Sequence, residues 1–128
     1  METDIARLAA ALERFPQLQL AILFGSLADG RGRVDSDIDI AVLADGELDA
    51  ALRMRLINTI AGLTGRAVDL VDLRRAGEPL LGEVLQGRRI LGSDASWGAL
   101  LSRHLIDAAD FGPLQRRLLA ERRRAWLG

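Results

Sequence analysis

The chain lacks several side chains on which enzymes commonly depend. Its 128 residues include no cysteine, no tyrosine and one histidine, His104, and all 17 basic residues are arginine. Without cysteine, disulfides and thiolate metal sites are excluded, which fits a reducing cytoplasm. Without lysine, a P-loop lysine and a Schiff-base lysine are excluded as well. Side-chain acid–base chemistry must therefore rest almost entirely on the 18 aspartates and glutamates.

Long apolar runs and a strong net charge are also missing. No apolar run approaches the roughly 18 residues of a membrane span, and acids interrupt the helical pattern at the N-terminus, so we expect neither a span nor a signal peptide. The apolar fraction of 49% and the net charge of −1 are typical of a folded protein and argue against wholesale nucleic-acid binding. We expect one cytoplasmic domain without direct DNA contact.

Charge is uneven along the chain. Between Pro113 and Gly128 five arginines stand against one glutamate, which gives this segment a local charge of +4 (five minus one). Such a segment is either a patch for a partner or nucleic acid, or the solvated basic end of a helix.

Apolar periodicity predicts an alternation of helices and short strands. Helices are expected over 4–15, 48–63 and 78–86 and from 96 onward, the last broken at 112–113; strands are expected over 18–24, 37–43 and 67–73, with a short edge strand over 88–91. We predict Thr3 as the N-cap of the first helix and Gly87 as the C-cap of the third. This order indicates an α/β or α+β domain with a small sheet and a C-terminal helical piece.

One segment, between Leu23 and Val42, holds the residues that we interpret as chemistry. Gly25 and Ser26 close an apolar run, and Asp37 and Asp39 follow after ten intervening residues. In a strand these two carboxylates share a side, about 6–7 Å apart along the chain. They repel each other unless a cation lies between them, and hard aspartate oxygens suit Mg²⁺. The alternative is a pair of solvated acids capped by loop donors.

A site with two metal ions needs a third carboxylate, and the third expected strand offers two. Alternation places Asp69 and Asp72 on opposite faces, so only one can join the first pair. Asp69 lies in the middle of the strand, where an unpaired carboxylate is costly, whereas water reaches Asp72 near the end. We therefore predict Asp69 as the third ligand; the alternative pairs it with Arg66 at a strand edge.

The glycine–serine turn is the expected phosphate contact. The Ser26 hydroxyl can bond a terminal phosphate, and Gly25 lets backbone approach closely. Arg31, Arg33 and Arg66 are candidates for neutralising a triphosphate, against the alternative that they are solvated loop arginines.

The histidine and the aromatic residues carry less of the interpretation. His104 stands among leucines on a helical stretch, so we expect a surface or core-rim residue and not a metal ligand. Trp97, Phe111 and Trp126 are expected to be core or partner-interface residues, because helical spacing does not separate the two.

The string G-S-x10-D-x-D, filled by Gly25, Ser26, Asp37 and Asp39, resembles the signature of the DNA polymerase beta-like nucleotidyltransferase superfamily. The short length and the run VDLVDL at 68–73 resemble the minimal nucleotidyltransferases, antitoxins encoded beside HEPN-domain toxins. The resemblance covers about residues 1–93 well and the C-terminal helices loosely.

This resemblance implies a polymerase beta-like fold, with a small mixed sheet of three or four strands flanked by helices and Gly25-Ser26 at the end of the first strand. It implies a nucleotidyltransferase core over 1–93 and a C-terminal helical extension over 94–128, packed on the core or on a partner. It also implies a site for two Mg²⁺ ions and for ATP. The implied metal ligands are Asp37, Asp39 and Asp69, and the implied nucleotide contacts are Gly25, Ser26, Arg31 and Arg33.

The implied activity is transfer of AMP from ATP to a tyrosine of a HEPN ribonuclease toxin, which neutralises it within a hetero-oligomer. Because the chain has no tyrosine, this acceptor must belong to another protein. Two alternatives are transfer to a small molecule, for which only about 35 residues follow the sheet, and inhibition by occlusion without chemistry.

The chain departs from the pattern at one place. Many relatives carry arginine soon after the glycine–serine pair, where this chain has Leu27, Ala28 and Asp29. Asp29 would repel a triphosphate, and Arg31 or Arg33 would have to compensate.

Overall fold

The computed structural model describes residues 2–25 and 36–110. The elements are α1 (Glu2–Leu12), β1 (Leu18–Phe24), β2 (Ile38–Ala44), α2 (Ala50–Thr64), β3 (Val68–Asp72), α3 (Leu80–Leu85), β4 (Arg88–Gly92) and α4 (Asp94–Asp110). All four expected strands and all four expected helices within these ranges are present, with ends that differ by a few residues at most. Three predicted nucleotide contacts, Ser26, Arg31 and Arg33, lie outside the described residues, as does Asp29.

The four strands form one mixed sheet in the order β3-β2-β1-β4. The central strand β1 is antiparallel to both neighbours, and β2 and β3 run parallel. A parallel pair needs a crossover, which α2 supplies. The predicted fold class, a small mixed sheet flanked by helices, is therefore confirmed.

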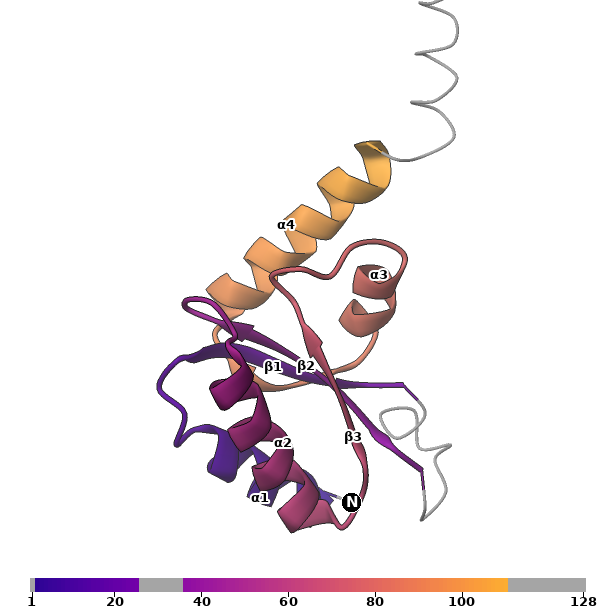
Figure 1. The fold of residues 1–128 in the computed structure, drawn as a ribbon. Coiled ribbons are helices and arrows are strands. Elements are labelled where there is room, and N and C mark those ends of the chain that lie inside the picture. Colours follow the sequence, from indigo (N-terminus) through magenta and orange to yellow (C-terminus); the bar gives the residue numbers. More distant parts are fainter. Residues whose placement is uncertain (1, 26–35, 111–128) are drawn as a thin grey trace, which may run out of the picture.

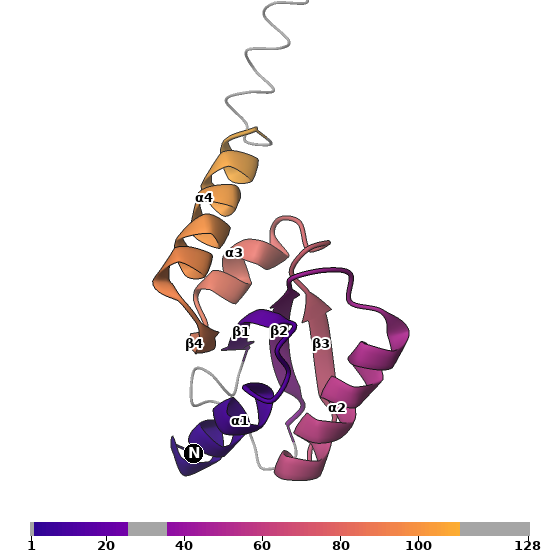
Figure 2. The ribbon, with the colours of Figure 1, turned by 90° about the vertical axis from the view of Figure 1, so that its left-hand side faces the viewer.

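One side of the sheet, the α1/α2 face, is covered by α1 and α2 (Figures 1 and 2). Strand alternation sends Leu23, Ile38 and Ile40 to this face, where they pack with Leu56 and Ile60 of α2. Alternate residues of a strand point to opposite faces, so the residues between them must point away from α1 and α2.

The opposite side, the α3/α4 face, is covered by α3 and α4 (Figure 2). Its core joins Leu20, Ile22 and Phe24 of β1 to Leu81 of α3 and Leu100 of α4, with further members Ala41, Leu73 and Val84. The helix α3 has only six residues, so it covers a short stretch of this face.

The two predicted caps are wrong, for different reasons. Helix α1 begins at Glu2, so Thr3 lies inside its first turn instead of before it. The C-cap of α3 is Gln86, and Gly87 follows it without a positive φ. A Cβ on Gly87 would overlap the carbonyl oxygen of Leu23 and lie 2.8 Å from Cβ of Phe24. Gly87 is thus explained by close packing on β1.

Helix α4 packs on the core through Leu100, with Trp97 partly buried beside it. The same helix leaves Leu101, Leu105 and Ile106 exposed. The division at residues 93 and 94 stays a prediction, because α4 both contacts the core and offers an apolar surface. None of the helices within 2–25 and 36–110 is long and apolar enough to cross a membrane.

Candidate active site

Asp39 lies at the centre of the candidate site, on the α3/α4 face. Its neighbours Ile38 and Ile40 are buried on the α1/α2 face, so alternation points Asp39 the other way. Phe24, the last residue of β1, pairs with Asp39 across the two strands. Gly25 follows with φ of 75°, and a Cβ there would overlap Asp39 Oδ2. Glycine at position 25 thus serves both the turn and the contact.

Asp69 meets Asp39 from the neighbouring strand. The parallel register of β2 and β3 places Asp39 opposite Asp69, whose negative charge contributes to the raised pKa of Asp39. The buried neighbour Leu70 faces α1 and α2, which leaves Asp69 on the α3/α4 face. Strand pairing therefore brings together two acids that are 30 positions apart in sequence.

The sequence left two alternatives at β3: Asp72 as the third metal ligand, and Arg66 as the ion-pair partner of Asp69. Asp72 and Arg66 both make other contacts. Asp72 accepts a hydrogen bond from the backbone N–H of Arg74 at 3.0 Å, and its Oδ2 lies 4.0 Å from Nε of Arg75. It thus shapes the turn that ends β3. The Arg66 guanidinium donates to the carbonyl oxygen of Ser36 at 2.9 Å, which joins the start of β3 to the start of β2.

The crowding of negative charge is visible in the acidity of Asp39. The pKa of Asp39 is raised above its ordinary value. Partial burial is the largest cause, and the negative charges of Asp69, Asp37 and Glu83 contribute less, in that order. A raised pKa means that the folded protein disfavours the ionised form at this position. A bound cation or a set of hydrogen-bond donors would relieve that cost.

The residues present fit Mg²⁺ in donor type, because aspartate oxygens are the ligands that this ion prefers. Asp37 is exposed, Asp39 is half-buried and Asp69 is exposed, so water can complete a coordination shell. Within the described ranges, no three acidic or histidine side chains already surround one point as metal ligands. The fit is therefore one of charge and chemistry, and no preformed coordination geometry is described.

Sequence reasoning missed Glu83, an exposed residue of α3 whose charge acts on Asp39. Together with Gly25, Gln86 and Gly87 it lines a small hollow beside the acids. No local motif marks this residue. Only the position of α3 over the end of β1, fixed by Leu81 and Val84 in the core, brings it to the site.

His104 is a half-buried rim residue, as expected. Its Nδ1 makes a hydrogen bond with Oε1 of Glu78, and Oε2 of the same carboxylate accepts from the N–H of Gly82 at 3.3 Å. This contact joins α4 to the start of α3, and the histidine is engaged there.

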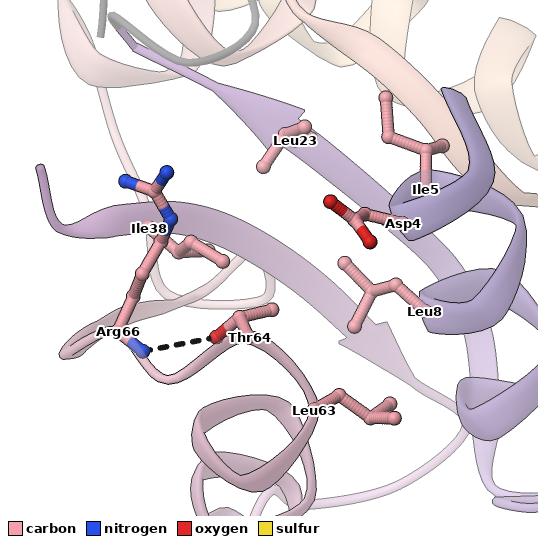
Figure 3. Close-up of a pocket in the computed structure, with 8 residues that line it drawn as sticks. All are labelled: Asp4, Ile5, Leu8, Leu23, Ile38, Leu63, Thr64 and Arg66. Carbon is pink, nitrogen blue, oxygen red and sulfur yellow. Dashed lines mark hydrogen bonds between the residues drawn. The ribbon is translucent and has the colours of Figure 1, made fainter. Parts of the chain in front are cut away.

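A separate pocket opens on the α1/α2 face (Figure 3). It is lined mostly by apolar side chains, and its polar lining residues are Asp4 of α1, Thr64 of α2 and Arg66. None of the acids of the α3/α4 face contributes to it, so the candidate site does not include this pocket.

Comparison with known proteins gives consistent matches. Residues 6–96 match the family model described as polymerase beta, nucleotidyltransferase. The protein adenylyltransferase MntA of Shewanella oneidensis is 44% identical over 82 residues, which span 63% of this chain and 59% of that relative. The chain thus matches less than two thirds of the length of that curated relative.

Solved structures match over more of the chain. A toxin–antitoxin complex with AMP-PNP contains a chain that is 34% identical, with a TM-score of 0.69 and coverage of 97% of this chain and 94% of that one. The structure of a tri-AMPylated HEPN toxin of Shewanella oneidensis in complex with MNT antitoxin contains a chain that is 30% identical, with a TM-score of 0.68. The match covers 97% of this chain and 93% of that one.

Proposed function

Because the chain belongs to the polymerase beta nucleotidyltransferase family, we propose that it is a Mg²⁺-dependent protein adenylyltransferase that transfers AMP from ATP to a tyrosine of a HEPN-family ribonuclease toxin, and so acts as its antitoxin. The observation that carries this proposal is the contact of Asp39 with Asp69 and Gly25 at one edge of the sheet. The similarity to a protein adenylyltransferase and to an antitoxin bound to an AMPylated toxin supports the same reading.

The acids are the proposed metal ligands. Asp37, Asp39 and Asp69 would hold two Mg²⁺ ions. When bound, Mg²⁺ neutralises phosphate charge and acts as a Lewis acid toward the reacting phosphoryl group. The negative charges of these side chains repel one another, and a divalent cation bound between them would relieve that repulsion.

The nucleotide would lie against the turn after β1. Gly25 presents backbone without a side chain, which lets phosphate oxygens approach. Ser26, Arg31 and Arg33 stay proposed nucleotide contacts, since they lie outside the described residues. ATP is the proposed donor, in line with the AMP-PNP complex of a similar chain.

The acceptor must come from a partner, because the chain contains no tyrosine. A hetero-oligomer with the toxin is the proposed assembly, in line with the toxin–antitoxin complexes that contain similar chains. We also propose that residues 1–93 form the catalytic core and that 94–128 form a helical extension toward the core or the partner.

The test is to replace Asp37 and Asp39 with asparagine, singly and together, and to follow radiolabel from α-labelled ATP onto the co-purified toxin. We expect transfer to fall by about 100-fold or more, because charge stabilisation at the phosphoryl group is lost. Asp45→Asn, in an exposed turn beyond the other end of β2, is the matched control and should leave transfer unchanged. Undiminished transfer in the double variant would overturn the proposal.

A second measurement addresses the metal and occlusion. Mg²⁺ should raise the melting temperature of the wild-type chain more than that of Asp39→Asn, because a ligand that binds the folded state stabilises it.

A ribonuclease assay of the complex made without ATP separates chemistry from occlusion. Full inhibition without nucleotide would show that binding alone neutralises the toxin.

A further inference from the structure

The hollow beside the acid cluster has a floor of backbone. Two of its four lining residues are glycines, Gly25 and Gly87, and neither position has room for a Cβ. At Gly25 the obstacle is Asp39, and at Gly87 it is the β1 backbone at Leu23 and Phe24. The hollow therefore depends on the same close contacts that build the acid site, and the two are continuous at Gly25.

Glu83 forms one wall of this hollow. Its neighbours Leu81 and Val84 are fully buried in the α3/α4 core, which fixes the helix that carries it. Its side chain is exposed, and the described residues supply no hydrogen bond or ion pair to its carboxylate. The carboxylate is nevertheless close enough for its charge to act on Asp39. Glu83 is thus an acid on a well-anchored helix, without a structural partner among the described residues.

The charges around the hollow restrict what it can receive. Glu83 and Gly25, which contacts Asp39, both line the hollow, and the Glu83 carboxylate would repel a phosphate group placed directly against it. A neutral hydroxyl fits better, since a carboxylate accepts its proton and the Gln86 amide can donate to its oxygen. Glu83 and Gln86 therefore favour the acceptor on their side of the hollow, whereas the triphosphate would lie at the turn after β1.

Few groups in this chain could deprotonate such a hydroxyl. Lysine and tyrosine are absent, and the single histidine, His104, is engaged by Glu78. The strand aspartates are the proposed metal ligands, and among the residues that the structure describes Glu83 is the acid that lines the hollow.

We propose that Glu83 is the catalytic base of the transfer and that the hollow between Gly25 and Gly87 receives the hydroxyl-bearing side chain of the acceptor. This inference rests on the proposed adenylyltransferase function. The acceptor O–H bond breaks and its proton passes to the Glu83 carboxylate, while the oxygen forms a bond to the α-phosphorus of ATP. The bond from that phosphorus to the β-bridging oxygen breaks, and pyrophosphate leaves with the electron pair. The proton on Glu83 is then released to water.

The experiment measures single-turnover AMP transfer to the co-purified toxin by Glu83→Gln. We expect the rate to fall by about 100-fold or more, as for loss of a general base, while the affinity for AMP-PNP stays within about twofold. Glu83→Asp keeps a carboxylate and should recover part of the rate. Glu13→Gln, an exposed acid after α1, is the matched control and should transfer at the wild-type rate.

A more acidic acceptor separates a base from a merely structural residue. In toxin whose tyrosines are replaced by fluorotyrosine, the phenol hydroxyl is more acidic and depends less on a general base. The loss of transfer rate in Glu83→Gln should therefore be smaller with this acceptor. An equal defect on both acceptors, or an unchanged rate in Glu83→Gln, would overturn the inference. If the wild-type chain transfers no label at all, the proposed function fails instead, so the two failures are distinguishable.

Discussion

The two faces of the sheet differ in how completely they are covered. Within the described part of the chain, twelve buried apolar residues pack between the sheet and α1 and α2, against eight beneath α3 and α4. On the first face α2 is capped at both ends, by Asp49, whose Oδ1 accepts from the N–H of Leu52 at 2.8 Å, and by Gly65 with φ of 66°. On the second face a six-residue helix stops beside the acids.

This difference places stability and chemistry on opposite sides of one sheet. Crowded carboxylates oppose folding, because the raised pKa of Asp39 reports a cost for its charge. The well-packed α1/α2 face tolerates that cost without contributing any acid to the site. The fold therefore allows the α3/α4 face to stay open where a substrate must enter.

A matched pair of leucines tests this comparison with the largest expected effect. Leu56 on the α1/α2 face and Leu81 on the α3/α4 face are both fully buried. Leu56→Ala should lower the free energy of unfolding by about 4–5 kcal/mol and Leu81→Ala by about 2–3 kcal/mol, because a short helix beside a hollow can relax into the cavity. Urea unfolding of both variants measures the difference. An equal or larger loss for Leu81→Ala would show that the faces are equally supported.

A pair of glycines gives a smaller effect and sharpens the contrast at the site. Gly65→Ala meets no atom within 4 Å and should cost about 1–2 kcal/mol of unfolding free energy from its positive φ alone. Gly25→Ala has a similar φ but would also push into Asp39. We expect it to cost more than Gly65→Ala and to reduce AMP transfer, as measured by urea unfolding and by the label assay. Equal costs with normal transfer would mean that Asp39 moves aside freely.

The fold was readable from the sequence because its signals are local and regular. The apolar run that became β1 ends at the predicted residues, and alternation correctly put Ile38 and Ile40 on the face opposite Asp39. Helix ends were less readable. Glycine is typical of a helix C-cap, but Gly87 instead allows close packing on Leu23 and Phe24 of β1, which lie 64 and 63 positions earlier in the sequence (87 minus 23 and 87 minus 24). Pairwise packing of distant segments carries no local pattern.

The site was partly readable for the same reason. Alternation predicts that Asp37 and Asp39 share a face; in the structure Asp37 is exposed and lies directly before β2. Alternation also allowed only one of Asp69 and Asp72 to join them, and Asp69 was preferred because it lies in the middle of the strand. The contact of Asp39 with Asp69 depends on the parallel register, which no single segment contains. Glu83 could not be found at all, since it reaches the acids only after α3 has packed over β1. The roles of all these acids stay predictions until they are tested.

The smallest expected effect concerns pH and the sign of the charge cost. The folded-state pKa of Asp39 is raised, so its protonated form favours folding below the ordinary aspartate value of 3.8, and this contribution is lost as pH rises through the raised value. In chelator-treated buffer, Asp39→Asn should therefore gain stability relative to the wild type as pH rises from about 3.8 toward neutrality. Urea unfolding of both proteins across this range measures the difference. A loss of stability of Asp39→Asn relative to the wild type would show that the folded protein favours the ionised Asp39 carboxylate. The α3/α4 face would then carry no charge cost at Asp39 for the α1/α2 face to offset.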